Sequence, residues 1–69
     1  MELFLKITVN GEARTTAART LAGLCSELGL EEAKIATARN GEFVPAKQRA
    51  EVSLAEGDVI EVLSPRQGG

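Results

Sequence analysis

Two Asn-Gly dipeptides, at positions 10–11 and 40–41, limit how this chain can fold. Asn-Gly favours tight hairpin turns of two residues, because both positions tolerate positive φ. Before the first dipeptide, residues 1–9 alternate apolar and polar side chains, which predicts a half-buried strand with its odd positions facing the core. Residues 12–16 then return as a second, more polar strand. The turns therefore predict a sheet that is built largely from hairpins.

A short amphipathic helix is predicted between the two hairpins. Its apolar face contains four residues at the spacing i, i+3, i+4 and i+7: Leu21, Leu24, Cys25 and Leu28. Thr20 can accept a hydrogen bond from a free N–H group at the helix start, and Gly29 suits the left-handed cap at the end. A helix of about nine residues is too short to be stable alone. We therefore expect its apolar face to cover the odd-numbered side of the first strand.

Three further strands are predicted in the second half of the chain, at residues 35–39, 42–44 and 59–63. Pro45 ends the fourth strand, residues 46–52 leave room for one helical turn, and residues 55–58 form a tight turn. The order strand-strand-helix-strand-strand-strand predicts an α+β domain, a small mixed sheet covered by one helix. This is the β-grasp arrangement, in which the first and last strands lie side by side at the centre of the sheet.

The composition disfavours several classes of function. At 69 residues the chain has room for one domain with a small core, and its net charge of −2 disfavours a nucleic-acid-binding face. No apolar run is long enough to cross a membrane, and the start of the chain lacks the features of a signal peptide. The chain has no His, Tyr or Trp, so the commonest general base and metal ligand are missing. A binding module or carrier is therefore favoured over a self-contained enzyme.

Three residues with reactive side chains are predicted to have structural roles. Cys25 is the single cysteine, so no internal disulfide can form, which fits a reducing cytoplasm. Because it lies on the apolar face of the helix, we interpret it as a buried small hydrophobic residue rather than a sulfur relay. Asp58 is expected in a turn and Glu61 at an exposed strand position, rather than as a pair of metal ligands.

The chain is expected to consist of a domain at residues 1–63 and a flexible tail at residues 64–69. Pro65 cannot continue a strand ladder as an interior residue, because it has no N–H group. Gly68 and Gly69 have no Cβ, so this end could enter a channel that excludes side chains. Fully extended, the tail reaches roughly 20 Å. The terminal carboxylate is therefore the candidate functional group, and the alternative is a frayed end without a function.

Several short segments occur in an order that matches a known family: Val-Asn-Gly-Glu at 9–12, Thr-Leu at 20–21, Ala-Arg-Asn-Gly-Glu-Phe-Val-Pro at 38–45, Glu-Gly-Asp-Val-Ile-Glu at 56–61 and Gln-Gly-Gly at 67–69. With these segments, the whole chain resembles the ThiS/MoaD family of ubiquitin-like sulfur carriers, and within it the carriers of thiamine biosynthesis. The resemblance implies the ubiquitin-like β-grasp fold. The chain differs from the family at residues 46–50, where members often have Arg and Trp and this sequence has no aromatic residue.

The resemblance implies a chemistry for Gly69. In the family, an E1-like adenylyltransferase of the ThiF type adenylates the terminal carboxylate with ATP, and sulfur from a cysteine desulfurase converts it to a thiocarboxylate. The loaded carrier then gives this sulfur to a thiazole synthase of the ThiG type. Gly68, Gln67 and Arg66 are then expected to be the part of the tail that the channel of a partner enzyme requires, and the alternative for Arg66 and Gln67 is that they are solvated tail residues. The chain would then be a co-substrate that is monomeric when free, binds no cofactor itself and depends on its partner for ATP.

Phe4 and Leu63 are predicted to form a docking surface beside the tail. Odd positions of the first strand and positions 60 and 62 of the last strand are expected to face the core, so Phe4 and Leu63 face outward. Neighbouring central strands would bring them together as an exposed apolar patch, which is typical of a protein-binding surface. Three other functions stay open: a small subunit of the molybdopterin-synthase type, a ubiquitin-like modifier joined to lysines, and a plain interaction domain.

Overall fold

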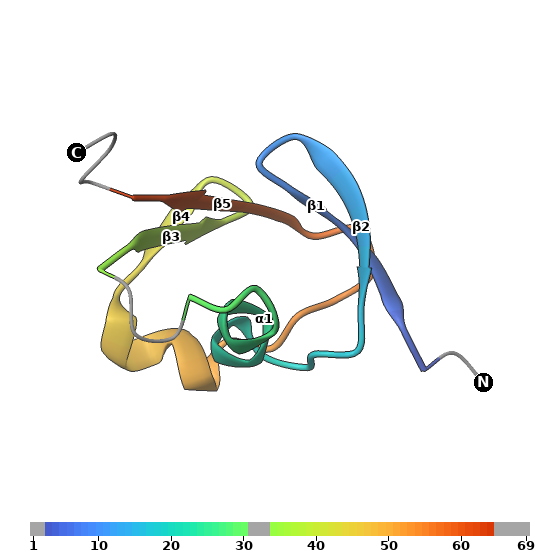
Figure 1. Ribbon diagram of the computed structural model, residues 1–69, viewed down its shortest axis with the longest axis horizontal. Coiled ribbons are helices and arrows are strands. Elements are labelled where there is room, and N and C mark those ends of the chain that lie inside the picture. Colours follow the sequence, from blue (N-terminus) through green and yellow to red (C-terminus); the bar gives the residue numbers. More distant parts are fainter. Residues whose placement is uncertain (1–2, 31–33, 65–69) are drawn as a thin grey trace.

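A five-stranded mixed sheet, covered on one face by a helix, forms the body of the protein (Figure 1). The structure is a computed structural model, and it describes residues 3–30 and 34–64. In chain order the elements are β1 (Leu5–Val9), β2 (Glu12–Thr16), α1 (Leu21–Glu27), β3 (Ala36–Arg39), β4 (Glu42–Val44), η1 (Ala46–Glu51) and β5 (Val59–Leu63). The short 3₁₀ helix η1 confirms the helical turn predicted for its segment. Within these described ranges, no helix is long and apolar enough to cross a membrane.

The strands β1 and β5 lie side by side at the centre of the sheet, whose strand order is β2-β1-β5-β3-β4. They run parallel, with Thr8 opposite Val59 and Val9 opposite Ile60, and the other neighbouring strands pair antiparallel. A parallel pair requires a long crossover, and α1 lies within the segment that joins β1 to β5. This is the predicted β-grasp topology. The strand that leads to the C-terminal segment therefore has a neighbour on both sides.

Both Asn-Gly dipeptides form the predicted hairpin turns. Asn10 and Gly11 have φ angles of 51° and 84°, and Asn40 and Gly41 have φ angles of 50° and 87°. Positive φ at both central residues is the geometry of the type I′ turn, whose twist matches that of paired strands. Around these turns β1 pairs with β2, and β3 pairs with β4.

The caps of α1 are those that the sequence predicts. At the start, the N–H group of Gly23 donates to Thr20 Oγ1 at 3.0 Å. At the end, Gly29 has a φ angle of 74°, and the N–H group of Leu30 donates to the carbonyl of Cys25 at 2.9 Å, as in a Schellman motif. These caps limit α1 to 7 residues, slightly fewer than expected.

The core lies between α1 and the sheet face that it covers. Six buried aliphatic residues form it: Ile7, Leu21, Leu24, Val44, Leu54 and Ile60. Burying each such side chain contributes about 1.5–3 kcal/mol relative to leaving it exposed. Leu5, Val9 and Val62 pack against this cluster and are half-buried. The odd positions of β1 therefore face the core, as predicted.

The first strand is shorter than predicted. It begins at Leu5, and Leu3 lies outside it with 65% of its surface exposed. The neighbouring strand β2 ends at Thr16, directly opposite Leu5, so residues before Leu5 have no partner on that side. Alternation in a sequence indicates which residues share a face, but it does not show where pairing with a neighbour stops. The third strand likewise begins at Ala36, one residue later than predicted.

Candidate functional site

The end of β5, next to the C-terminal segment, is hydrogen-bonded to the first hairpin turn. The side chain of Asn10 donates through Nδ2 to the carbonyl of Val62 at 3.2 Å and accepts the Val62 N–H group on Oδ1 at 2.8 Å. Because β1 ends at Val9, this amide takes the place that a further strand residue would occupy beside β5. The last residues before the predicted tail are therefore held to the fold by a side chain.

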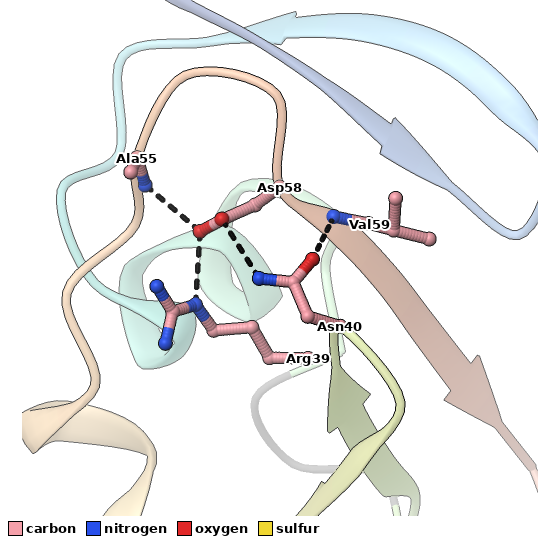
Figure 2. Close-up of polar contacts among 5 residues, drawn as sticks. All are labelled: Arg39, Asn40, Ala55, Asp58 and Val59. Atoms are coloured by element: carbon pink, nitrogen blue, oxygen red, sulfur yellow. Dashed lines mark hydrogen bonds and ion pairs between the residues drawn. The ribbon is translucent and has the colours of Figure 1, made fainter.

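The start of β5 is hydrogen-bonded to the second hairpin turn, as Figure 2 shows. The carboxylate of Asp58 accepts hydrogen bonds from Arg39 Nε at 2.9 Å, from the Ala55 N–H group at 2.8 Å and from Asn40 Nδ2 at 3.1 Å. The Asn40 side chain also accepts the N–H group of Val59 at 2.8 Å. The asparagines of both turns thus bind main-chain groups of β5, one near each end of the strand.

The environment of Asp58 favours its ionised form. Burial by itself would raise the pKa of this carboxyl group, since only 5% of the residue is exposed. The hydrogen bonds from Arg39, Ala55 and Asn40 and the charge of Arg39 outweigh burial, so the pKa lies below its ordinary value. Asp58 therefore joins the turn at 55–58 to the β3–β4 hairpin. Glu61 is exposed on β5, as predicted. In the described ranges, no group of three or more His, Cys, Asp or Glu residues could hold a metal ion.

An apolar patch covers the exposed face of the sheet at the end of β5. Leu63 lies opposite Ala36 of β3, and Phe43 of β4 lies opposite Ala38. Leu63 and Phe43 are each 68% exposed. The small alanines between them leave a shallow hollow of about 100 Å³, which Glu61 also lines. We call Leu63, Phe43, Ala36 and Ala38 the Leu63–Phe43 patch.

The predicted pairing of Phe4 with Leu63 in one patch is wrong. Both residues are exposed, Phe4 by 53%, as predicted. However, β1 and β5 are parallel with Thr8 opposite Val59, so Phe4 lies four residues before this pair and Leu63 lies four residues after it. At roughly 3.3 Å per residue, it lies about 25 Å from Leu63 along the strand direction. Figure 1 shows β1 beginning at the right of the view and β5 ending at the left.

A second hollow lies on the opposite side of the β5 end, between the first hairpin and the end of α1. It has a volume of about 400 Å³. Five apolar residues line it: Val9, Leu28, Leu30, Ile35 and Val62. Ser64, the last described residue, also borders it. Concave surface therefore lies on both sides of the strand that leads to the C-terminal segment.

The remaining predicted residues fall inside the core or beyond the described chain. Cys25 is 3% exposed on the apolar face of α1, as predicted. Burial raises the pKa of its thiol, and the charge of Arg49 opposes this only in part. The low exposure of Cys25 and the raised pKa of its thiol fit a core residue. Arg66, Gln67, Gly68 and Gly69 lie outside the described residues.

The fold and the site define a class of protein, a β-grasp domain of the ubiquitin-like kind whose central strand ends beside an exposed apolar patch. The ThiS family model matches residues 7–69. The chain belongs to the ThiS family. This confirms the sulfur carrier of thiamine biosynthesis predicted from the sequence, and the comparisons do not favour the molybdopterin-type or modifier alternatives.

Individual relatives agree with the family. The sulfur carrier protein ThiS of Thermus thermophilus is 33% identical over 63 residues, which are 91% of this chain and 98% of that protein. The crystal structure of the thiamine biosynthesis protein (ThiS) from Geobacter metallireducens superposes with a TM-score of 0.77 at 28% identity, covering 94% of this chain and 100% of that one. A thiazole synthase of Paramagnetospirillum magneticum is 38% identical over 66 residues, which are 94% of this chain but only 20% of that protein.

Proposed function

We propose that the carboxylate of Gly69 is the group on which this protein carries sulfur. The observation that supports this most directly is the extent of the family match, which runs from residue 7 to residue 69 and so includes the C-terminal glycines. At neutral pH the α-carboxyl group is an anion, because its pKa is about 3.3–3.7. A carboxylate is a poor electrophile, so it must be activated before sulfur can be attached to it.

Activation as an acyl adenylate supplies the missing leaving group. A Gly69 carboxylate oxygen attacks the α-phosphorus of ATP, and pyrophosphate leaves. The terminal sulfur of a persulfide, supplied by the desulfurase, then attacks the acyl carbon and AMP leaves. A thiol reduces the resulting acyl disulfide, forms a disulfide with the donor's sulfur and releases a thiocarboxylate whose terminal sulfur is a strong nucleophile. The catalytic groups and the ATP site belong to an E1-like partner of the ThiF type, and this chain is its co-substrate with no cofactor of its own. Gly68, which has no side chain, together with Gln67 and Arg66, passes through the partner's channel.

The partners follow from the same chemistry. Sulfur originates from a cysteine desulfurase, and the acceptor is a thiazole synthase of the ThiG type. The thiazole synthase relative supports this acceptor, since a segment of its own longer chain matches nearly all of this protein. The Leu63–Phe43 patch docks on these enzymes, because it includes Leu63, the last strand residue before the segment that must enter the active site. We place the protein in the cytoplasm, where its lone thiol stays reduced.

Reconstitution of sulfur loading tests the proposal. The protein is incubated with its activating enzyme, ATP, cysteine and a cysteine desulfurase, and its intact mass is measured. We expect a mass increase that corresponds to replacement of one oxygen by sulfur, located at Gly69 by fragmentation. Deletion of Gly69 removes the reacting glycine and should abolish the change. Sulfur found on Cys25 instead, or loading that survives the deletion, contradicts the proposal.

A further inference from the structure

Glu61 places a charge in an otherwise apolar stretch of the exposed sheet face. Along β5 it lies between Val59 and Leu63, which are 44% and 68% exposed and face the same side. Across the strand pair it lies opposite Ala38, whose neighbour on the far side is Phe43. Apolar side chains therefore flank this carboxylate on three sides.

No group within residues 3–30 and 34–64 pairs with the charge of Glu61. Its side chain forms no ion pair or hydrogen bond with another residue of these ranges. The basic strand residue on the same face of the sheet is Lys6. Since Thr8 pairs with Val59, Lys6 lies two residues before this pair and Glu61 two residues after it, about 13 Å apart along the strand direction. Exposed charges more than about 8 Å apart are largely screened at physiological ionic strength.

Glu61 also lines the shallow hollow of the Leu63–Phe43 patch. The hollow has a volume of about 100 Å³, whereas sites for drug-sized ligands measure about 300–1,000 Å³. It therefore suits a single side chain of another protein rather than a small molecule. Its walls include the apolar side chains of Leu63 and Phe43 and the carboxylate of Glu61. The side chain that fits these walls has an apolar stem and a positively charged end.

We propose that the activating enzyme docks one arginine side chain in this hollow. Its methylene stem packs between Leu63 and Phe43, and its guanidinium group binds the Glu61 carboxylate. Arginine commonly covers apolar surface with its stem while its charged end keeps polar partners. The inference rests on the proposed function, in which the Leu63–Phe43 patch contacts this enzyme, and it adds the chemistry of that contact.

The position of Glu61 requires a partner of this kind. Docking on the patch removes water from the carboxylate, and a buried carboxylate without a counterion is strongly unfavourable. Charged residues are accordingly depleted at the centres of interfaces, where arginine is enriched. A guanidinium group forms two parallel hydrogen bonds with a carboxylate, which the ammonium group of lysine does not match. Glu61 thus favours a partner with an arginine at this point and disfavours one with an acidic or wholly apolar surface.

Direct binding tests the proposal without sulfur transfer. The complete protein is titrated into the activating enzyme in the absence of ATP, and Kd is measured by calorimetry. Glu61→Gln preserves the size of the side chain and removes its charge, so Kd should rise about tenfold or more. Failure of the proposed function is seen as missing sulfur at Gly69, whereas failure of the present proposal is seen as unchanged binding by Glu61→Gln.

Glu42→Gln is the matched control. Glu42 is also exposed, but it directly precedes Phe43 on β4 and so faces the other side of the sheet. The control loses the same charge, and its Kd should stay within about twofold of the wild type. Equal changes in Kd for the two variants would show that only the net charge matters and would overturn the proposal. Circular dichroism shows that each variant is folded.

Glu61→Met tests the sign of the effect. If the enzyme presents an apolar surface at this point, methionine removes the cost of burying a carboxylate, and Kd should fall. Under the proposal, the substitution instead leaves the arginine without its partner, so Kd should rise at least as much as for Glu61→Gln. A lower or unchanged Kd for Glu61→Met overturns the proposal.

Exchange of charges identifies the arginine. When the surface arginines of the enzyme are replaced by glutamate one at a time, one variant should bind Glu61→Arg more tightly than the wild-type enzyme does. If none does, the proposal is wrong. Glu61→Gln should also weaken binding to the same extent when Arg66 is replaced by glutamine. An effect that disappears in this background would assign the partner of Glu61 to the chain's own tail and overturn the proposal.

Discussion

Asn10 and Val62 exchange two hydrogen bonds, at 2.8 and 3.2 Å, between a turn side chain and the last central strand. The two residues are separated by most of the chain, yet the pair lies directly before the segment that carries the terminal glycines. The same side chain belongs to the hairpin turn, where its φ of 51° suits asparagine. One residue therefore sets both the first turn and the end of β5.

Replacing Asn10 by glycine should loosen the end of β5 without changing the hairpin. Glycine accepts the positive φ of the turn, so only the two side-chain hydrogen bonds are lost. Each hydrogen bond contributes about 0.5–1.5 kcal/mol, so the Val62 amide should exchange its hydrogen about tenfold faster or more. We also expect slower sulfur loading, because the tail then leaves from a less ordered strand. Hydrogen exchange by NMR and a loading assay measure both effects.

Asn40→Gly is the matched control for this change. It alters the equivalent turn residue, and it removes the hydrogen bond to the N–H group of Val59 rather than that to Val62. Protection should fall at Val59 and stay unchanged at Val62, and loading should slow less than in Asn10→Gly. Equal loading rates for the two variants would show that Asn10 acts only through overall stability.

Phe43→Ala should weaken the interaction with the activating enzyme. Phe43 is 68% exposed, so its removal should change the free energy of unfolding by no more than about 0.5 kcal/mol. Aromatic residues at the centre of an interface often contribute more than 1 kcal/mol. We therefore expect KM for the carrier in the loading reaction to rise about fivefold or more, with a similar rise for Leu63→Ala.

Phe4→Ala provides the comparison. It is the same substitution at an exposed phenylalanine, but it lies at the opposite end of the central strands. KM should stay within about twofold of the wild type, since a surface change away from an interface has little effect. A larger rise in KM for Phe4→Ala than for Phe43→Ala would restore Phe4 as a docking residue and remove the Leu63–Phe43 patch.

Cys25→Ala should lower stability and leave sulfur loading intact. The thiol packs on the apolar face of α1 with 3% of the residue exposed, so its removal leaves a small void. We expect the free energy of unfolding to fall by about 1 kcal/mol, measured by urea denaturation. The folded variant should still gain one sulfur atom at Gly69 at the wild-type rate. Loss of loading in a variant that is folded would instead assign a relay function to this thiol.

Local patterns in the sequence predicted the fold well. Asn-Gly turns, the Thr20 cap and the Gly29 cap each depend on a few neighbouring residues, and all three occur as predicted. Alternation likewise predicted that Phe4 and Leu63 face outward. It could not predict their separation, because distance along a parallel pair depends on the register between strands that are remote in sequence. The register instead brings Leu63 near Phe43. Phe43 directly precedes Val44, which faces the core, so alternation within β4 indicates that Phe43 faces outward.

The side-chain hydrogen bonds to β5 could not be predicted from the sequence. The sequence indicates Asn10 and Asn40 only as turn residues, and Asp58 only as a member of another turn. Their additional hydrogen bonds to β5 form because the sheet topology places both hairpins beside this strand. A turn preference is a local property, whereas a bond between Asn10 and Val62 requires knowledge of which strands are neighbours.

Asp58 should make the stability of the protein depend on pH. Its pKa is lower in the folded protein than in the unfolded chain, so the ionised form stabilises the fold. This contribution is complete above the unfolded pKa of about 3.9, and it is lost as the pH falls through the folded pKa. Asp58→Asn removes the charge that Arg39 contacts and an acceptor for the Ala55 N–H group. We expect a loss of about 2–3 kcal/mol at neutral pH.

The difference between the wild type and Asp58→Asn should therefore shrink in acid. Urea denaturation at neutral pH and at several values below about pH 4 gives the free energy of unfolding of each protein. The two curves should converge as the wild-type carboxyl group becomes protonated, because the variant no longer has this group to titrate. Glu61→Gln is the control, since it removes an exposed carboxylate from the same strand and should change stability by no more than about 0.5 kcal/mol at neutral pH. A difference between wild type and Asp58→Asn that stays constant down to low pH would show that Asp58 acts through packing rather than through its charge.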